Sequence, residues 1–277
     1  HVPNIAPRSP EGKDSSDNVV EKDGPIPFDY YTKNDDFARV DHKTLGERLG
    51  IFDFERGAKI SGSGFPVYRG LGSRLERALI QFFLDEHQKN GFEEFTPPYL
   101  VTRNTMRGTG QLPKFEEDMY RCDKDDDLFL IPTAEVPLTN LYAGEVIPES
   151  ELPKRICAYS ACFRREAGSY GKDTRGLLRL HQFNKVEMVY FAHPEHSYED
   201  HEELTRFGEK LLEKLGLPYH RLALCKGDLG FGAAKCYDLE VYAPVEKKWL
   251  EVSSCSNFED YQARRANIKT KINGKNV

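Results

Sequence analysis

The sequence of 277 residues lacks the features that mark zinc-binding, membrane-bound and secreted proteins. Its six cysteines form no Cys-x-x-Cys pair and show no Cys/His ligand spacing, so we expect reduced thiols rather than a zinc site or a disulfide framework. No run of about 18 apolar residues occurs, and the polar N-terminus does not resemble a signal peptide. These absences predict a soluble, cytoplasmic protein with no membrane segment.

Two common nucleotide-binding motifs are also missing. The run Gly227–Lys235 is rich in glycine, but it lacks the third glycine and the preceding βαβ pattern of a dinucleotide fold. The run Gly168–Asp173 lacks the spacing of a P-loop and the Ser/Thr after its lysine. The net charge of −6 argues against wholesale coating by nucleic acid, although it leaves room for a local basic groove. There is no internal repeat.

What remains is a mixed pattern of helices and strands. Apolar residues recur at helical spacing, and Gly216 and Pro218 follow the last such segment as stop signals. Helices interrupting strands of this kind predict an α+β fold with a mainly antiparallel sheet flanked by helices. The expected helices span His42–Gly50, Leu71–Gln88 and Glu202–Leu215, and the expected C-terminal strands span His220–Cys225, Cys236–Tyr242 and Lys248–Ser254.

Three segments are predicted to be less regular. Residues 1 to about 37 are rich in Pro, Asp, Asn and Lys without apolar periodicity, which indicates an extended linker, and residues 52–64 form another connector. Glu93–Val101 is strand-like, but Pro97 and Pro98 confine it to a sheet edge or an interface.

Arg164 and Glu166 carry the strongest chemical signal. They are two apart in the strand-like run Cys162–Gly171, so as a strand both would point to one face. A guanidinium offers a fixed fork of donors for phosphate oxygens, and a carboxylate offers acceptors for an amino group. The alternative is an ordinary cross-strand salt bridge.

A second strand-like run, Arg179–Phe191, follows a loop from Gly168 to Gly176. One face of this run is polar or aromatic and the other is mostly apolar, which predicts a half-buried antiparallel hairpin whose polar face lines a site. The loop is too long for a tight turn, so we expect it to be mobile and to face the substrate. The polar face consists of Arg179, His181, Phe183, Lys185 and Glu187.

The hairpin resembles the second signature motif of class II aminoacyl-tRNA synthetases, through Phe163-Arg-Arg-Glu166 and Gln182-Phe-Asn-Lys-Val-Glu-Met188. More narrowly, it is similar to the seryl-tRNA synthetase family. Three further blocks support this in the family's order: Gly108–Phe115, Leu130–Leu138 and Glu251–Asn257. The resemblance covers roughly residues 45 to 265.

The resemblance implies a two-step reaction in which ATP activates L-serine to seryl-adenylate and the seryl group then passes to tRNA(Ser). It also implies Mg²⁺ and a homodimer in which Pro98 lies at the interface. Arg164 would be the catalytic residue, bridging the α-phosphate and the serine carboxylate, and Phe183 would stack on adenine. The remaining expected ATP contacts are Arg165, Glu166, Arg179, Glu251, Val252, Ser253 and Ser254.

The resemblance also implies a serine site and a metal site. A small hydroxylated amino acid must be selected by hydrogen bonds rather than by hydrophobic volume. Glu251 and Ser254 would hold Mg²⁺ between ATP phosphates, because that ion prefers hard oxygen ligands and an incomplete protein shell. The expected serine contacts are Thr133, Ala134, Glu135, Arg164 and Glu187.

The chain departs from the family in two places. Members carry a helical arm before the core and a third motif after it, and neither matches this sequence. We therefore expect a catalytic core at residues 45–277, incomplete at its C-terminus, behind an N-terminal extension at 1–44. A synthetase-like module that binds adenylate or serine without turnover remains the alternative, and a metabolic enzyme outside this class is more remote.

Overall fold

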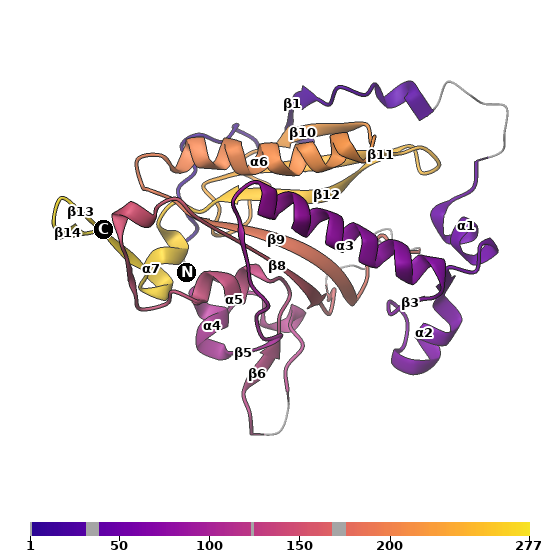
Figure 1. Ribbon diagram of the computed structural model, residues 1–277, viewed down its shortest axis with the longest axis horizontal. Helices are drawn as coiled ribbons and strands as arrows, with labels where there is room; N and C mark the ends of the chain where they lie inside the picture. Colours follow the sequence, from indigo (N-terminus) through magenta and orange to yellow (C-terminus); the bar gives the residue numbers. More distant parts are fainter. Residues whose placement is uncertain (1, 32–38, 123–124, 168–175) are drawn as a thin grey trace. The chain divides into compact units, whose positions relative to one another are not determined.

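The computed structural model describes residues 2–31, 39–122, 125–167 and 176–277 (Figure 1). Two compact units make up the chain. The first comprises residues 1–39, 144–154 and 190–277, and the second comprises residues 40–143 and 155–189. Each unit is thus assembled from segments far apart in the sequence. Strands with flanking helices fill both, as the predicted α+β class requires.

An antiparallel sheet forms the first unit, in the order β1-β10-β11-β12. β10 (Tyr219–Ala223), β11 (Lys235–Ala243) and β12 (Lys248–Asn257) confirm the three C-terminal strands expected from the sequence. β1 (Val19–Asp23) lies within the segment expected to be an extended linker. As an edge strand with mostly exposed side chains, β1 has no buried face, so it leaves no alternating apolar pattern.

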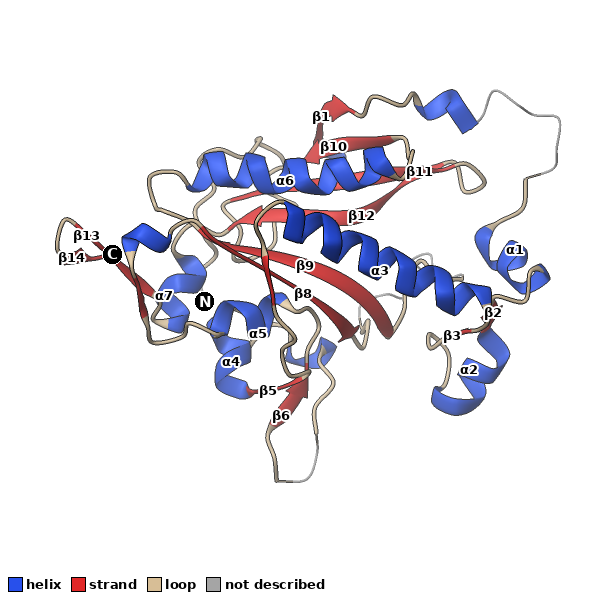
Figure 2. Ribbon diagram, viewed as in Figure 1, coloured by secondary structure: helices blue, strands red, loops and turns tan. Residues whose placement is uncertain are grey.

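Helix α6 (Ser197–Lys214) packs on β11 and β12 (Figure 2). Leu212 joins Tyr219 and Leu239 in a buried cluster, and the His201 ring contacts the Cys255 carbonyl oxygen at 2.7 Å. The helix begins five residues before the expected start. Its first turn carries Glu199 and Asp200, which favour a helix N-terminus electrostatically but add nothing to the apolar stripe.

The rest of the first unit consists of short elements. A small sheet has the order β14-β13-β7, in which β13 and β7 are parallel. A 3₁₀ turn, η4 (Glu149–Glu151), follows β7. The other bounds are β7 (Val146–Ile147), α7 (Tyr261–Ala266), β13 (Lys269–Ile272), β14 (Lys275–Asn276), η1 (Ser15–Asp17) and η2 (Phe28–Tyr31).

The second unit is built on strands β4, β8 and β9, in that order. β8 (Lys154–Phe163) and β9 (Gln182–Phe191) are long neighbours, and β4 (Glu93–Glu94) pairs with β8 in parallel. Helix α3 (Leu71–Lys89) matches the expected helix closely and runs along these strands (Figure 1). A 2.6 Å hydrogen bond from the Asn184 side chain to Glu76 joins β9 to α3.

Two expectations for this unit are wrong in detail. The single strand expected from Glu93 to Val101 is interrupted: β4 ends at Glu94, and β5 (Leu100–Thr102) begins after Pro97 and Pro98. Proline has no N–H to donate to a ladder, so the strand breaks there. The expected connector at 52–64 contains a helix, α2 (Phe54–Ser61). The Asp53 carboxylate caps α2 by accepting from the Arg56 N–H at 2.9 Å, a start signal that the sequence analysis missed.

A dense core fixes the loops around the end of β8. It lies among β5, α4 (Arg103–Gly108), β6 (Leu128–Leu130) and α5 (Glu135–Asn140). Other elements of this unit are α1 (His42–Arg48), as expected, β2 (Phe52–Asp53), β3 (Val67–Tyr68) and η3 (Glu116–Asp118). Across the described parts of the chain, no helix combines the length and apolarity that crossing a membrane requires. The core side chains are Val101, Met106, Leu112, Met119, Phe129, Ile131 and Val136.

We expect Ile131→Ala to lower the free energy of unfolding by about 2–5 kcal/mol, because the side chain is 0% exposed and would leave a cavity. The matched control is Ile60→Ala, at a side chain that is 76% exposed on α2, where a change within about 0.5 kcal/mol is expected. Urea unfolding followed by circular dichroism measures both. Equal effects of the two substitutions would contradict the assignment of this core.

Candidate functional site

The segment between β6 and α5 is buried and strongly tied down. Ile131 accepts a backbone hydrogen bond from the Phe163 N–H at 2.9 Å, which joins this segment to the end of β8. Pro132, Thr133 and Ala134 follow as buried residues. The Thr133 hydroxyl accepts from the Glu135 N–H at 3.2 Å at the start of α5. Thr133 and its neighbours therefore have little freedom to move.

Arg164 is held in place on three sides. Its N–H donates to the His181 carbonyl oxygen at 2.9 Å, and its own carbonyl oxygen lies 3.0 Å from His181 Nδ1. A carbonyl can only accept, so Nδ1 of His181 carries the proton in this contact. The guanidinium Nε donates to the Pro132 carbonyl oxygen at 3.3 Å. Among the described residues the two terminal nitrogens of the guanidinium have no hydrogen-bond partner, so they form an available fork of donors.

Phe183 lies beside that guanidinium. The Arg164 Cζ atom is 5.0 Å from the centroid of the Phe183 ring, within the range of a cation–π interaction. Phe183 is the second residue of β9 and is partly buried. A fixed cation next to a flat aromatic surface suits a ligand that carries both a phosphate and a planar base.

Glu187 is anchored through a single oxygen. Its Oε2 accepts from the Thr133 hydroxyl at 2.6 Å and from Lys185 Nζ at 2.8 Å. Within the part of the chain that the structure describes, no hydrogen bond to Oε1 is present. The carboxylate is thus oriented by two donors and still offers an acceptor oxygen. The sequence pattern puts Lys185 on this face but gives it no role.

Lys185 remains charged in this setting. Burial is the largest single effect and lowers the pKa of Lys185, but the charge and hydrogen bond of the Glu187 carboxylate, together with the nearby Cys162, outweigh it, so the pKa lies above its ordinary value. The ammonium therefore keeps its charge-assisted hydrogen bond to Glu187 at neutral pH. Alternation along β9 places Phe183, Lys185 and Glu187 on one face, as the sequence predicts.

Arg164 and Glu166 do not form the strand pair that their spacing suggests. β8 ends at Phe163, and Glu166 has a left-handed backbone with φ of +53°. Glu166 pairs instead with Arg179, at 2.5 Å from Oε2 to Nη1. Arg179 itself precedes β9, which begins at Gln182. Glu166 thus forms a salt bridge to the other side of the hairpin, just outside both strands, and among the described residues it has no ion pair with Arg164.

The chain beyond Arg164 is turned by contacts with Asp118. The Arg165 N–H donates to the Asp118 carbonyl oxygen, and the Ala167 N–H donates to Asp118 Oδ1, both at 2.9 Å. The Arg165 guanidinium lies 5.6 Å from the centroid of the Tyr120 ring. Most of the predicted substrate-facing loop, residues 168–175, lies outside the described residues.

The other predicted residues lie on β12, in the first unit. Asp238 pairs with Ser254, and Glu240 pairs with Glu251, although Glu251 and Ser254 are three positions apart. The register shift leaves Val252 without a partner on β11. This β-bulge lets Glu251 and Ser254 share one face with the two acidic residues of β11. Alternation alone would have put them on opposite faces.

The opposite face of this ladder packs on α6. A side-chain carbon added at Gly208 of α6 would lie 3.0 Å from Leu239 and 3.8 Å from the Ser253 hydroxyl oxygen. Leu239 and Ser253 alternate with Asp238, Glu240, Glu251 and Ser254. The face that these four residues form, called the acidic face below, therefore points away from α6. Glu251 and Ser254 are exposed on it. Val252 is 54% exposed at the bulge.

Asp238 is the residue on this face that sequence reasoning missed. Burial, reinforced by the nearby Glu251 carboxylate, raises the pKa of Asp238 to about 7. Crowded carboxylate oxygens with a hydroxyl beside them are hard ligands suited to Mg²⁺. The residues therefore fit the ion that the sequence resemblance implies. Two acidic residues, Asp238 and Glu240, alternate with apolar and aromatic residues along β11, and this alternation is the signal that could have identified Asp238.

Pro98 is exposed, as an interface residue would be in an isolated chain. In the same unit Leu71 and Leu75 on α3 and Leu100 on β5 are exposed by 69%, 56% and 42%. These apolar side chains have water as their neighbour in the single chain. They form candidate contact residues for a second copy.

Comparison with known proteins supplies a family. A family model described as the tRNA synthetase class II core domain (G, H, P, S and T) matches residues 117–277. The serine–tRNA ligase of Chlorobium phaeobacteroides (strain BS1) is 57% identical over 275 residues, which cover 99% of this chain and 63% of that protein. The chain thus spans about 63% of the length of such curated relatives.

Solved structures agree with this match. The seryl-tRNA synthetase of Pyrococcus horikoshii, complexed with ATP, superposes with a TM-score of 0.90 at 39% identity and covers 99% of this chain and 65% of its own. The cytoplasmic serine–tRNA ligase of Naegleria fowleri, in complex with AMP, gives a TM-score of 0.91 at 29% identity, with 98% and 64% covered. Because the class II core model matches more than half of its residues, the chain belongs to the class II tRNA synthetase core family.

Proposed function

We propose that the chain is the catalytic core of a serine–tRNA ligase, which activates L-serine with ATP and transfers the seryl group to tRNA(Ser). The observation that carries the proposal is the anchoring of Arg164 and Glu187 to the neighbouring residues Pro132 and Thr133, with Phe183 beside the Arg164 guanidinium. Arg164 bonds to the Pro132 carbonyl and stacks on Phe183, while Glu187 bonds to the Thr133 hydroxyl. The 57% identity to a serine–tRNA ligase supports the choice of amino acid.

In the first step the serine carboxylate attacks the α-phosphorus of ATP, forming the mixed anhydride and releasing pyrophosphate. In-line displacement at phosphorus depends on alignment and charge neutralisation, with little covalent help from the protein. Arg164 is the catalytic residue in this proposal. Its free fork bridges the α-phosphate and the attacking carboxylate, two anions that would otherwise repel each other.

The proposed nucleotide contacts fall into separate sets of residues. Phe183 stacks on the adenine ring, next to the Arg164 cation. A second group of cations and carboxylates, Arg165, Glu166 and Arg179, would bind the rest of ATP in the second unit. The Glu166–Arg179 ion pair fixes the orientation of both side chains beforehand. In the first unit the ATP contacts would come from Glu251, Val252, Ser253 and Ser254.

Serine would be selected by Glu187 and by the Thr133–Glu135 segment. Two donors hold Glu187 through Oε2, so Oε1 is available to accept from a substrate ammonium or hydroxyl. Ala134 and Glu135 lie at the start of α5, where burial keeps the backbone fixed. A substrate without the hydroxyl would leave a carboxylate oxygen unsatisfied, which penalises alanine more than steric fit does.

Mg²⁺ would bind through Glu251 and Ser254, with Asp238 as a further carboxylate. When bound there, the ion would neutralise phosphate charge and orient the leaving pyrophosphate. The protein supplies three oxygen-bearing side chains on one face, and phosphate oxygens would complete the shell. The carboxylates repel one another until such a cation arrives.

The remaining partners follow from the same proposal. The terminal ribose of tRNA(Ser) would accept the seryl group, and a homodimer would bury Pro98 with the exposed leucines of α3. Residues 45–277 would form the core and residues 1–44 an N-terminal extension. A cytoplasmic location would suit the six thiols, none of which forms a disulfide. The alternative of a binding module without turnover predicts ligand binding but no pyrophosphate exchange.

The direct test is serine-dependent exchange of labelled pyrophosphate into ATP, run with each of the twenty amino acids on the full-length protein. We expect exchange with serine alone and a loss of at least about 100-fold in Arg164→Ala, because the transition state loses its bridging cation. Arg56→Ala, at an arginine 73% exposed on α2, is the matched control and should leave the rate unchanged. Undiminished exchange in Arg164→Ala would remove Arg164 from the mechanism.

Lys185→Met tests the anchoring of Glu187. Losing one of two donors should loosen the carboxylate, so we expect the KM for serine to rise about 10-fold while the KM for ATP stays within about two-fold. Steady-state exchange kinetics give both values. Lys59→Met, at an exposed lysine on α2, is the matched control. If both KM values rose together in Lys185→Met, the substitution would be acting on the fold rather than on serine recognition.

Asp238→Asn tests the acidic face. The folded-state pKa of about 7 lies above the ordinary value of 3.8, so protonation stabilises the native state at low pH and this stabilisation is lost as pH rises through 7. We therefore expect the variant to be more stable than the parent by about 1 kcal/mol or more at pH 8 and by less at pH 5.5. Urea unfolding in the presence of a chelator measures this.

The same variant should bind ATP less tightly in the presence of Mg²⁺, and Asp260→Asn, at an exposed carboxylate of the same unit, should change neither property. A pH-independent gain in stability would argue against the repulsion that the acidic face implies.

A further inference from the structure

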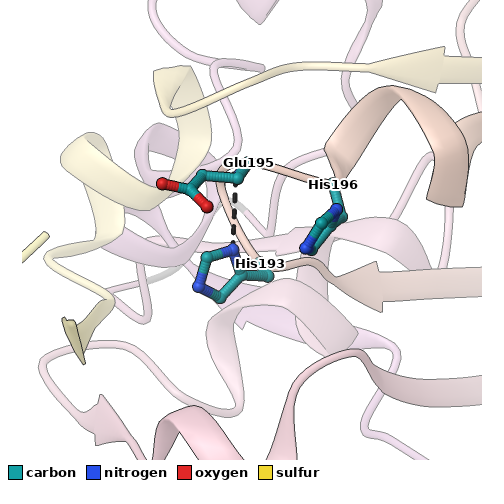
Figure 3. Close-up of side chains that lie close together, drawn as sticks. All are labelled: His193, Glu195 and His196. Carbon is teal, nitrogen blue, oxygen red and sulfur yellow. Dashed lines mark hydrogen bonds between the residues drawn. The ribbon is translucent and has the colours of Figure 1, made fainter.

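A compact group of metal-ligating side chains lies in the turn between β9 and α6, in the first unit. His193, Glu195 and His196 each offer one ligand atom, and these atoms all lie within 4.8 Å of one another. Figure 3 shows the two imidazole rings and the carboxylate gathered around this turn. None of the three belongs to the serine, ATP or Mg²⁺ contacts of the proposed function. We propose that this group is a binding site for a transition-metal dication such as Zn²⁺.

The turn is closed by its own backbone. The His196 N–H donates to the His193 carbonyl oxygen at 2.9 Å, and the Asp200 N–H donates to the His196 carbonyl oxygen at 2.9 Å as α6 begins. Pro194 restricts the backbone between the two histidines. The imidazole centroids are 5.3 Å apart. Ligands from one short, closed turn need little further ordering when an ion binds.

The donor set selects the class of metal. Two imidazoles and one carboxylate match the preferences of Zn²⁺, Co²⁺, Ni²⁺ and Cu²⁺, whereas Mg²⁺ and Ca²⁺ favour oxygen ligands alone. Three protein ligands leave a fourth position for water. Glu195 and His196 are exposed and His193 is partly buried, so an ion can reach the site from solvent.

A fourth side chain gives His193 a metal-ready arrangement. Glu149 of η4 lies 3.5 Å from His193 Nε2, and the Glu195 N–H donates to His193 Nδ1 at 3.2 Å. Nδ1 therefore carries the lone pair, and Nε2, which then carries the hydrogen, lies near a carboxylate. Ligating histidines usually donate their other N–H to such a carboxylate, which fixes the tautomer. An ion would replace only the long hydrogen bond from Glu195 N–H.

The local charges favour a cation despite the nearby helix N-terminus. The start of α6 carries a partial positive charge that opposes cation binding. Four carboxylates counter it: Glu149, Glu195, and Glu199 and Asp200 in the first turn of α6. The ion would connect the end of β9, the start of α6 and, through Glu149, η4. It would therefore stabilise the first unit by linking three of its segments.

Isothermal titration with Zn²⁺ on the full 277-residue chain tests the proposal. We expect one equivalent to bind, an excess of Mg²⁺ to leave it in place, and the melting temperature to rise on binding. His196→Gln, at an exposed residue, should abolish this binding, and Glu149→Gln should weaken it about 10- to 100-fold. Glu199→Gln removes a neighbouring charge but no ligand, so it should weaken Zn²⁺ binding by no more than about three-fold.

Co²⁺ substitution identifies the ligands independently. The absorption spectrum should show d–d bands of a nitrogen and oxygen site. Thiolate charge transfer would appear instead if the ligand were Cys122, the one cysteine of the six that is not buried. Circular dichroism of metal-free His196→Gln should match the parent, which separates a lost ligand from a lost fold. Unchanged Zn²⁺ binding in His196→Gln, or a thiolate band in the Co²⁺ spectrum, would overturn the proposal. Serine-dependent exchange plays no part in either measurement.

Discussion

The hydrogen bond from the Thr133 hydroxyl to Glu187 is the contact on which the candidate site depends. Thr133 belongs to a buried segment that is bonded to the end of β8 through Ile131, while Glu187 lies in the middle of β9. The bond therefore fixes the strand that carries Phe183 relative to the carbonyl that holds Arg164. Each polar group of the site is oriented by another, so little ordering remains to be done when a ligand binds.

A different device organises the acidic face of the first unit. There the β-bulge at Val252 changes the register, so that Glu251 and Ser254 join Asp238 and Glu240 on one face. No side-chain hydrogen bond is needed to align them, because backbone pairing sets the face. Glu251 and Ser254 are three positions apart in the sequence, and simple alternation would place them on opposite faces. The bulge that brings them to one face could not be predicted from this spacing.

The sequence predicted the long elements and the polar side of β9, because both have regular periods. α3 and the three C-terminal strands each bury one side, and Phe183, Lys185 and Glu187 occupy every second position of β9. The short features were not predicted. β1 has no buried face, and the only sequence signal for α2 is its capping residue Asp53. The turn after Phe163 depends on Asp118, which is far away in the sequence. Such features come from contacts or backbone angles that a local pattern does not encode.

Two acidic residues of the first unit, the fully buried Glu209 and the half-buried Asp238, differ in how the fold compensates their charge. Glu209 is 0% exposed and lies within ion-pair distance of Lys22, Arg206 and Arg221, so its charge is compensated by the fold itself. Asp238 has no such ion pair in the described part of the chain; burial raises its pKa, and the nearby Glu251 and Glu240 carboxylates raise it further. The same unit thus places three cations around Glu209 but, in its described part, none beside Asp238. The proposed Mg²⁺ would supply at Asp238 the positive charge that the fold supplies at Glu209.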